Sequence, residues 1–480
     1  MPTPEERFSR LAREAQRESR LPSLSAAVFR AGEVVWSEAI GLADAEVGRE
    51  TTSDTQYAVA SITKTFTAAA VMQLRDEGRL DLDDPLERHL PGTVHGSLPL
   101  RRMLAHASGL QREPPGEVWE TLVFPAEEEL LARLPDAEQV LPGATAWHYS
   151  NLAYALLGQV VARISGTPFR EHVEQRLVRP LGLDRTTWGF DPPSARPYFV
   201  EPFSDALRRE PELELGGKGG ESGLCSTVGD LARWGSFLCD PEQSLLAPAS
   251  VAQMHDVQIM AEPDWTLGWG LGIELWRRGD RIFGGHTGGL PGFISMLGYS
   301  RRERIGAVLL TNSGSWQKAV ETGLALVGAA LEELAVPPAP WVPEEPPPAE
   351  IVPLLGRWWS EGRETIFSWR GGRLEARLAA ARPERAPSVF EPDGEDRFRT
   401  VSGDERGELL RVVRGEDGGV DKLYWATYPF TRTPDTFGAR SDGHDSGSPL
   451  GPVERFAGLL PEAIVSGKGA HVCHADVTNA

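Results

Sequence analysis

The chain has 480 residues and a formal net charge of −20, with 40% hydrophobic and 25% charged residues. This length predicts two or three domains, each able to bury its own core. The negative charge argues against binding to a nucleic-acid backbone, which requires a basic surface. An acidic surface that keeps the protein in solution is the simplest interpretation.

The N-terminal stretch MPTPEERFSRLAREAQRESRL has no apolar segment between a basic start and a cleavage site. It predicts an amphipathic helix rather than a signal peptide. No stretch reaches the 18 consecutive apolar residues typical of a membrane span. The three cysteines are too few and too scattered for a disulfide framework. We therefore expect a cytoplasmic protein that contacts neither membrane nor nucleic acid.

Secondary-structure signals predict one α+β unit with a helical middle. The run LSAAVFRAGEVVWSEAIGLAD predicts two strands joined across residues 30–32, and strand patterns return from about residue 266. Gly166 and Gly182 stand where helices are expected to end. Helical periodicity is found in 61–77, 151–166, 169–182, 227–240 and 315–334.

The remaining third of the chain has a different composition. Residues 336–353 are rich in Pro and Glu and predict an extended linker after a first domain at 1–335. Short β-rich runs with Gly turns in 354–438 predict a small β-barrel or sandwich, in which the Trp-rich GRWWSEG contributes to the core. The last stretch, 439–480, predicts a disordered tail. Its HVCHAD run lacks a second ligand cluster, so no metal and no other cofactor is predicted.

Three short motifs occur in order: SITK (Ser61–Lys64), YSN (Tyr149–Asn151) and HTG (His286–Gly288). The chain has seven tyrosines and three asparagines, so a chance Y-x-N is expected only about 0.04 times. A chance S-x-x-K is expected about 0.3 times because lysine is scarce here. All three motifs together, in this order, are therefore strong evidence for a functional site.

The first two motifs fit nucleophilic catalysis. A serine hydroxyl needs a neighbouring base, and positions i and i+3 of a helix share a face, so Lys64 can lie beside Ser61. A cation near a tyrosine lowers its pKa, so Tyr149 beside Lys64 is predicted to act as a general base. Asn151 offers an amide to Lys64 or to the carbonyl of a substrate. Taken alone, Ser61 could be a helix cap and Tyr149 a core residue.

The third motif predicts the opposite wall of a substrate cleft. His286 and Thr287 would line this wall, although His286 could also be purely structural. Gly288 and Gly289 would allow close approach of a substrate backbone, and the N–H of Gly289 is the predicted second donor to an oxyanion, beside that of Ser61. His106, in LAHASGL (104–110), is predicted to be a hydrogen-bonded scaffold residue.

The three motifs together with LAHASGL resemble the serine penicillin-recognising family, which includes class C β-lactamases, serine DD-peptidases, D-aminopeptidases and related esterases. The resemblance implies an antiparallel sheet flanked by helices, with an all-helical subdomain. It places the family's serine nucleophile on Ser61, its lysine on Lys64 and its tyrosine on Tyr149. The third-motif wall falls on His286, Thr287 and Gly288.

One departure narrows the expected activity. Class C β-lactamases carry K-T-G where this chain has H-T-G, a form more similar to the peptidase and peptide-cyclising members. The resemblance therefore implies a D-amino-acid peptidase or esterase, acting on a peptide or small-molecule substrate, rather than an efficient β-lactamase. The loop at 111–125 is predicted to border the cleft and to shape specificity.

Two alternatives remain open from the sequence. The chain could be an acyl transferase that cyclises or releases a peptide carried as a thioester, which the expected cytoplasmic location favours. Region 354–438 also resembles the lipocalin-like domain of some family peptidases and cyclases. It could instead be a non-catalytic ligand binder that has kept the pocket. The sequence leaves the oligomeric state open.

Overall fold

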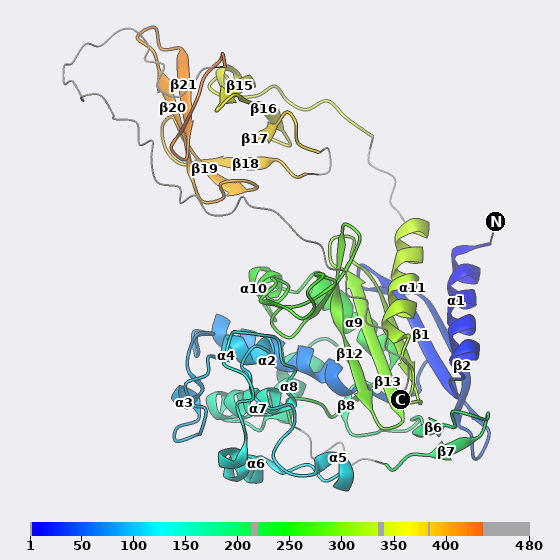
Figure 1. Cartoon of the computed structure of the whole chain (residues 1–480). Coiled ribbons are helices and arrows are strands. Elements are labelled where there is room, and N and C mark those ends of the chain that lie inside the picture. The colour runs from blue at the N-terminus through cyan, green and yellow to red at the C-terminus, as the bar shows by residue number, and fades with distance from the viewer. Residues whose placement is uncertain (1, 213–218, 335–339, 383–384, 435–480) are drawn as a thin grey trace, which may run out of the picture. The chain divides into compact units, whose positions relative to one another are not determined.

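The computed structural model describes residues 2–212, 219–334, 340–382 and 385–434 (Figure 1). It divides into two compact units, one up to residue 337 and one from residue 338 onward. Each unit has a hydrophobic core built from its own residues. The predicted disordered tail and the HVCHAD run lie outside the described residues.

Within the described residues, nine strands form an antiparallel sheet at the centre of the first unit. Its first hairpin turns at Ala31 and Gly32, which both have positive φ, as the sequence predicted. The last strand pairs with the first, so strands from the two ends of the unit lie side by side and the α+β prediction is confirmed. In spatial order the strands are β3 (Arg49–Glu50), β2 (Glu33–Asp44), β1 (Ser23–Arg30), β14 (Ile305–Thr311), β13 (Phe293–Ser300), β12 (Arg281–Leu290), β11 (Glu274–Arg278), β10 (Leu267–Trp269) and β9 (Ile259–Met260).

Alternate residues of β1 point to two different cores, because successive side chains of a strand face opposite sides of the sheet. Ala26 and Val28 pack on the side of α1 (Pro4–Glu18) and α11 (Ala319–Glu333), which lie next to each other (Figure 1). Ala27 and Phe29 pack on the side of α9 (Val228–Cys239). The central sheet is therefore covered by helices on both faces.

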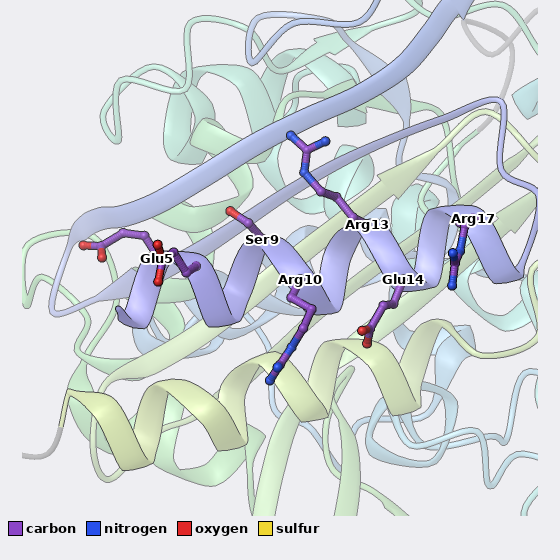
Figure 2. Close-up of a pocket in the computed structure, with 7 residues that line it drawn as sticks. Glu5, Ser9, Arg10, Arg13, Glu14 and Arg17 are labelled. Atoms are coloured by element: carbon purple, nitrogen blue, oxygen red, sulfur yellow. The ribbon is translucent and has the colours of Figure 1, made fainter. Parts of the chain in front are cut away.

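The N-terminal helix has the predicted amphipathic pattern. It begins with a capping box between Thr3 and Glu6, and its Phe8 is buried against the sheet. An open hollow along this helix is lined by residues of α1 alone, so it cannot enclose a substrate. These residues are Glu5, Glu6, Ser9, Arg10, Arg13, Glu14 and Arg17 (Figure 2).

A mainly helical subdomain lies between β4 (Tyr57–Ala58) and α9. Ser150 caps its central helix by accepting a hydrogen bond from the N–H of Ala153, and Gly166 ends that helix in the left-handed conformation, as predicted. The helix predicted in 169–182 continues into a π-helical turn, Glu174–Val178. The helices between β4 and α9 are α2 (Thr63–Asp76), α3 (Leu86–His89), α4 (Leu100–Leu104), α5 (Val118–Thr121), α6 (Glu127–Arg133), α7 (Asn151–Ser165) and α8 (Phe169–Val173); α10 (Pro248–Met254) follows α9.

In the described part of the second unit, eight strands pair in sequence order as an antiparallel meander. A bridge between Trp359 and Thr431 joins its two ends and nearly closes a barrel, which confirms the prediction of a small β-barrel. Trp358, from the predicted Trp-rich core segment, is fully buried with Phe367 and Phe390. The strands are β15 (Gly356–Ser360), β16 (Arg363–Arg370), β17 (Arg373–Leu378), β18 (Ser388–Pro392), β19 (Arg397–Ser402), β20 (Leu409–Arg414), β21 (Val420–Trp425) and β22 (Tyr428–Phe430).

Among the described residues, no helix has both the length and the apolar character needed to cross a bilayer. The cysteines at 225 and 239 are buried free thiols, and the third cysteine lies outside the described residues.

Candidate active site

Ser61 lies in a 3-10 turn, Ala60–Ile62, that leads directly into α2. The preceding residue, Ala60, has φ of 49°, a left-handed conformation that residues other than glycine rarely adopt. Such strain persists only where the surrounding structure imposes it, and it is concentrated at functional sites. Ser61 is half-buried, whereas its neighbours on both sides are fully buried, so the turn presents its side chain at the surface.

Hydrogen bonds from two other strands fix this turn. The N–H of Val59 donates to the carbonyl of Leu224 in β8 (Leu224–Ser226) at 3.0 Å. The carbonyl of Val59 accepts from the hydroxyl of Ser295 in β13 at 2.8 Å. The position of Ser61 is therefore set by segments that are more than 160 residues away in the chain.

Lys64 lies one turn after Ser61 on α2, as the spacing predicted. Its Nζ is 3.0 Å from Ser61 Oγ and 2.6 Å from the backbone carbonyl of Glu221. The Lys64 side chain is fully buried, and Nζ also lies 5.1 Å from the centre of the Tyr149 ring. The Lys64 amine therefore directs one of its hydrogen bonds at the Ser61 hydroxyl.

Tyr149 hydrogen-bonds Ser61, so both Lys64 and Tyr149 contact the same hydroxyl. The predicted lowering of the Tyr149 pKa is wrong. Burial raises the pKa of this phenol, and the hydrogen bond with Ser61 only partly opposes that effect. Loss of solvation therefore outweighs the nearby cation, and Tyr149 keeps its proton at neutral pH.

His106 is the scaffold residue that the sequence predicted. Its ring stacks on Tyr149 at 4.2 Å between ring centres, and its Nδ1 accepts a hydrogen bond from the backbone N–H of Ser150 at 3.0 Å. Burial lowers its pKa, so the ring is neutral. His106 thereby fixes the orientation of the Tyr149 ring through stacking.

Asn151 lies at the start of α7, but its amide nitrogen donates to the carboxylate of Glu113 at 2.7 Å. One of its two predicted roles, a hydrogen bond from this amide to a substrate carbonyl, would have to compete with Glu113. The guanidinium of Arg112 lies 4.8 Å from the centre of the Tyr149 ring. The loop that contains both Arg112 and Glu113 therefore borders the site, as expected for 111–125.

The third motif lies on β12, directly beside the serine turn. A Cβ atom on Gly288 would lie 2.2 Å from the carbonyl oxygen of Val59, so only glycine allows this strand to approach the turn so closely. Gly289 is exposed, and a Cβ there would meet only Ile294 at 3.4 Å. Close packing thus explains the first glycine, but not the second.

His286 is fully buried, and Thr287 is half-buried. Burial, with a smaller effect of the Lys64 charge, lowers the pKa of His286 to about 3, so this ring is neutral. Its Nδ1 lies 2.5 Å from the carbonyl oxygen of Thr287, which only an N–H can approach favourably. The wall therefore carries no cation at the position where class C β-lactamases have lysine.

Glu274, at the start of β11, is a site residue that the sequence analysis missed. It is only 6% exposed, and its Oε1 accepts from the N–H of Thr287 at 3.1 Å and from the Thr287 hydroxyl at 2.8 Å. Burial raises its pKa to about 7 in spite of these hydrogen bonds. The sequence did hold a signal: LGIELW places one acidic residue within an otherwise apolar run.

The structure thus brings Ser61, Lys64 and Tyr149 together and places Gly288 and Thr287 beside them. Within the described ranges, no group of three or more His, Cys, Asp or Glu side chains could hold a metal ion.

Comparisons with known proteins agree with this geometry. Residues 8–332 match the family described as Beta-lactamase, and residues 347–432 match a domain of unknown function, DUF7586. A D-stereospecific amidohydrolase from Streptomyces has a similar structure, with a TM-score of 0.57 and 26% identity over 66% of this chain and 98% of that one.

Two curated relatives carry activity names. The D-alanyl-D-alanine-carboxypeptidase/endopeptidase AmpH of Escherichia coli is 30% identical over 54% of this chain and 72% of that protein. The esterase EstB of Burkholderia gladioli is 37% identical over 35% of this chain. The chain spans about half the length of EstB and of another curated relative.

The fold and the matched family place the chain in the serine penicillin-recognising superfamily. The chain belongs to the β-lactamase family, whose model matches more than half of it.

Proposed function

We propose that this protein hydrolyses amide, peptide or ester bonds next to D-amino acid residues through an acyl-enzyme on Ser61. The observation that carries the proposal is the contact of one half-exposed hydroxyl with both Lys64 and Tyr149. The names of the relatives support the substrate class, because one specifies D-alanyl-D-alanine, a second a D-stereospecific amidohydrolase and a third an esterase.

In the acylation step, Ser61 Oγ attacks the carbonyl carbon of the substrate. The hydroxyl proton passes to the Lys64–Tyr149 pair and then to the leaving amine or alcohol as the carbon–leaving group bond breaks. A neutral lysine with a neutral tyrosine holds as many protons as an ammonium with a phenolate. Because burial raises the pKa of Tyr149, we assign proton acceptance to the Lys64 amine.

In this scheme, Tyr149 acts as a neutral hydrogen-bond partner that passes the proton toward the leaving group. Water then takes the place of the leaving group, attacks the Ser61 ester and releases the acid. The same residues serve both halves of the reaction, since the second half reverses the proton transfers of the first.

Strand geometry supports Gly289 as the second oxyanion donor. N–H groups of residues i and i+2 point to the same side of a strand, and the N–H of Thr287 points to the β11 side, toward Glu274. The N–H of Gly289 therefore points away from β13 and toward the side of β11. The pairing of β12 with β11 ends at Gly285 and Glu274, so Gly289 lies past the last paired residue of β12 on that side. Together with the N–H of Ser61 at the start of α2, it would bind the oxyanion.

The test is the intact mass of the protein after a brief exposure to a fluorophosphonate, with Ser61→Ala as the control. A single adduct on the wild type and none on the variant supports the nucleophile. Absence of an adduct on folded wild type would contradict the proposal and favour a ligand binder.

Turnover of D- and L-phenylalaninamide then tests the substrate class. We expect cleavage of the D-form at least about tenfold faster, because two relatives are named for D-specific substrates. Equal rates would refute the D-preference. Adding an amine acceptor shows whether the acyl group goes to water or to nitrogen, which separates a hydrolase from an acyl transferase.

A further inference from the structure

The hydrogen bonds of Thr287 limit what the wall can offer a substrate. Its backbone N–H and its hydroxyl hydrogen both go to Glu274 Oε1, at 3.1 and 2.8 Å. What remains on the half-buried Thr287 hydroxyl is a pair of acceptor lone pairs. A substrate group that meets this hydroxyl must therefore donate a hydrogen bond.

The charge behind this hydroxyl acts in the same direction. Glu274 is a buried carboxyl, and the nearest histidine, His286, has its Nδ1 at 3.4 Å from the same oxygen and is neutral. Charge interactions are strong in such surroundings, because little water screens them. Lys64, the proton acceptor in the proposed mechanism, contacts Ser61 and the carbonyl of Glu221.

We propose that Glu274 makes the third-motif wall selective against substrates with a carboxylate beside the scissile bond and favours substrates with an uncharged amide or ester there. The inference rests on the proposed function and specifies its substrate class. Penicillins and peptides that end in a free D-amino acid carry such a carboxylate. Amidated or esterified peptides do not, and an amide N–H can donate to the Thr287 hydroxyl.

The test uses two peptides that differ only in this group: N-acetyl-D-alanyl-D-alanine and its C-terminal amide. We expect the wild type to have at least about tenfold higher kcat/KM for the amide, since each tenfold corresponds to about 1.4 kcal/mol. Glu274→Gln keeps the shape and an acceptor oxygen but removes the charge. It should lower the ratio of kcat/KM for the amide to kcat/KM for the free acid by about tenfold, mainly through a lower KM for the free acid.

Glu303→Gln is the matched control. It removes the same charge at the turn between β13 and β14, where Glu303 pairs with Arg281 at the far end of β12. It should leave the ratio unchanged.

A pH series gives a second, independent readout. Burial raises the pKa of Glu274 to about 7, so its charge is lost as pH falls from 8 to 6, whereas the peptide carboxylate stays ionised. Among the groups around Glu274, His286 and Tyr149 stay neutral over this range. Lys64 also acts on Glu274 through its charge, and the Gln variant keeps this lysine, so any effect of Lys64 on the ratio is seen in the variant as well. The wild-type ratio should therefore shrink at pH 6, and the ratio of the Gln variant should stay constant.

The outcomes separate the two proposals. If Ser61 is labelled by the fluorophosphonate but Glu274→Gln leaves the ratio within about twofold, the role of Glu274 is refuted and the proposed function stands. If neither peptide is cleaved, each peptide is tested for protecting Ser61 from the fluorophosphonate. The peptide concentrations needed for protection then give the preference between amide and free acid. Absence of Ser61 labelling in folded wild type would refute the proposed function itself. A Gln variant that fails to fold is replaced by the pH series on the wild type, where a constant ratio overturns the inference.

Discussion

The interior of the first unit contains the ionisable side chains of Lys64, His106, Glu274 and His286, each in contact with a residue of the three sequence motifs. In the described part of the second unit, the buried polar side chains are the uncharged Thr365, Ser388 and Thr400. Its core consists of aromatic and aliphatic residues around Trp358. Burying an ionisable group costs free energy, so such groups persist where chemistry uses them. The comparison therefore assigns the chemistry to the first unit.

Lys64→Ala should give the largest effect. Without the amine, the serine hydroxyl loses its proton acceptor, and we expect kcat/KM to fall by about 10³-fold or more. Steady-state hydrolysis of a D-amino acid amide measures the change, with Lys318→Ala as the control because Lys318 is an exposed lysine. A comparable loss in the control, or full activity of Lys64→Ala, would break the assignment.

Trp358→Ala tests the other side of the comparison. Trp358 is fully buried in the barrel, and its indole N–H donates to the carbonyl of Leu354 at 2.7 Å. Its truncation should destabilise the barrel by about 3–5 kcal/mol. Urea unfolding measures this loss, and Ser61 labelling should continue at the wild-type rate. Trp341→Ala is the matched control, since Trp341 is 85% exposed.

Tyr149→Phe should lower kcat by about 10²-fold, because it removes the hydroxyl that contacts Ser61 but keeps the ring that stacks on His106. Thermal stability should change little, which distinguishes lost chemistry from lost packing. Tyr428→Phe, in the barrel, serves as the control. If the Tyr149 variant retained its full rate, Lys64 would act without the tyrosine.

The pH dependence of stability should also differ between the units. Burial lowers the pKa of His172 and of His255 to about 4 and that of His286 to about 3, against an ordinary value of 6.5. Below pH 6.5 these histidines bind protons in the unfolded chain but stay neutral in the folded unit. The free energy of unfolding should therefore fall as the pH is lowered from 6.5 to about 4. Glu274, with a raised pKa, acts in the opposite sense between about pH 4.5 and 7, but it is one group, whereas four described histidines, His106 included, have a lowered pKa.

Calorimetry between pH 4 and 7 measures this effect, which should amount to a few kcal/mol in the first unit. The second unit has no histidine in residues 340–434, so its transition should move less. Parallel shifts of both transitions would contradict the comparison.

Part of this site could be predicted from the sequence. The spacing in SITK places the lysine one helical turn from the serine, and the structure finds the two atoms 3.0 Å apart. Gly288 was predicted to let a substrate backbone approach, which stays a prediction; the structure shows that this glycine lets its own strand approach the serine turn. Such features depend on local geometry or on a rare residue type, and both can be read without knowing the fold.

Other features required the tertiary structure. Whether the Tyr149 pKa rises or falls depends on the balance between burial and charge, and burial is a property of the packed interior. The partner of Asn151 proved to be Glu113, which a nearby loop brings to the start of α7. Glu274 joined the site only because β11 pairs with β12.

From the sequence alone, the α+β architecture, the β-barrel and the approach of Lys64 to Ser61 could be predicted, because hydrophobic periodicity and motif spacing are encoded locally. Only the tertiary structure decided which groups lose their water. That loss of solvation sets the protonation of Tyr149, His286 and Glu274, and with it the electrostatic character of the site.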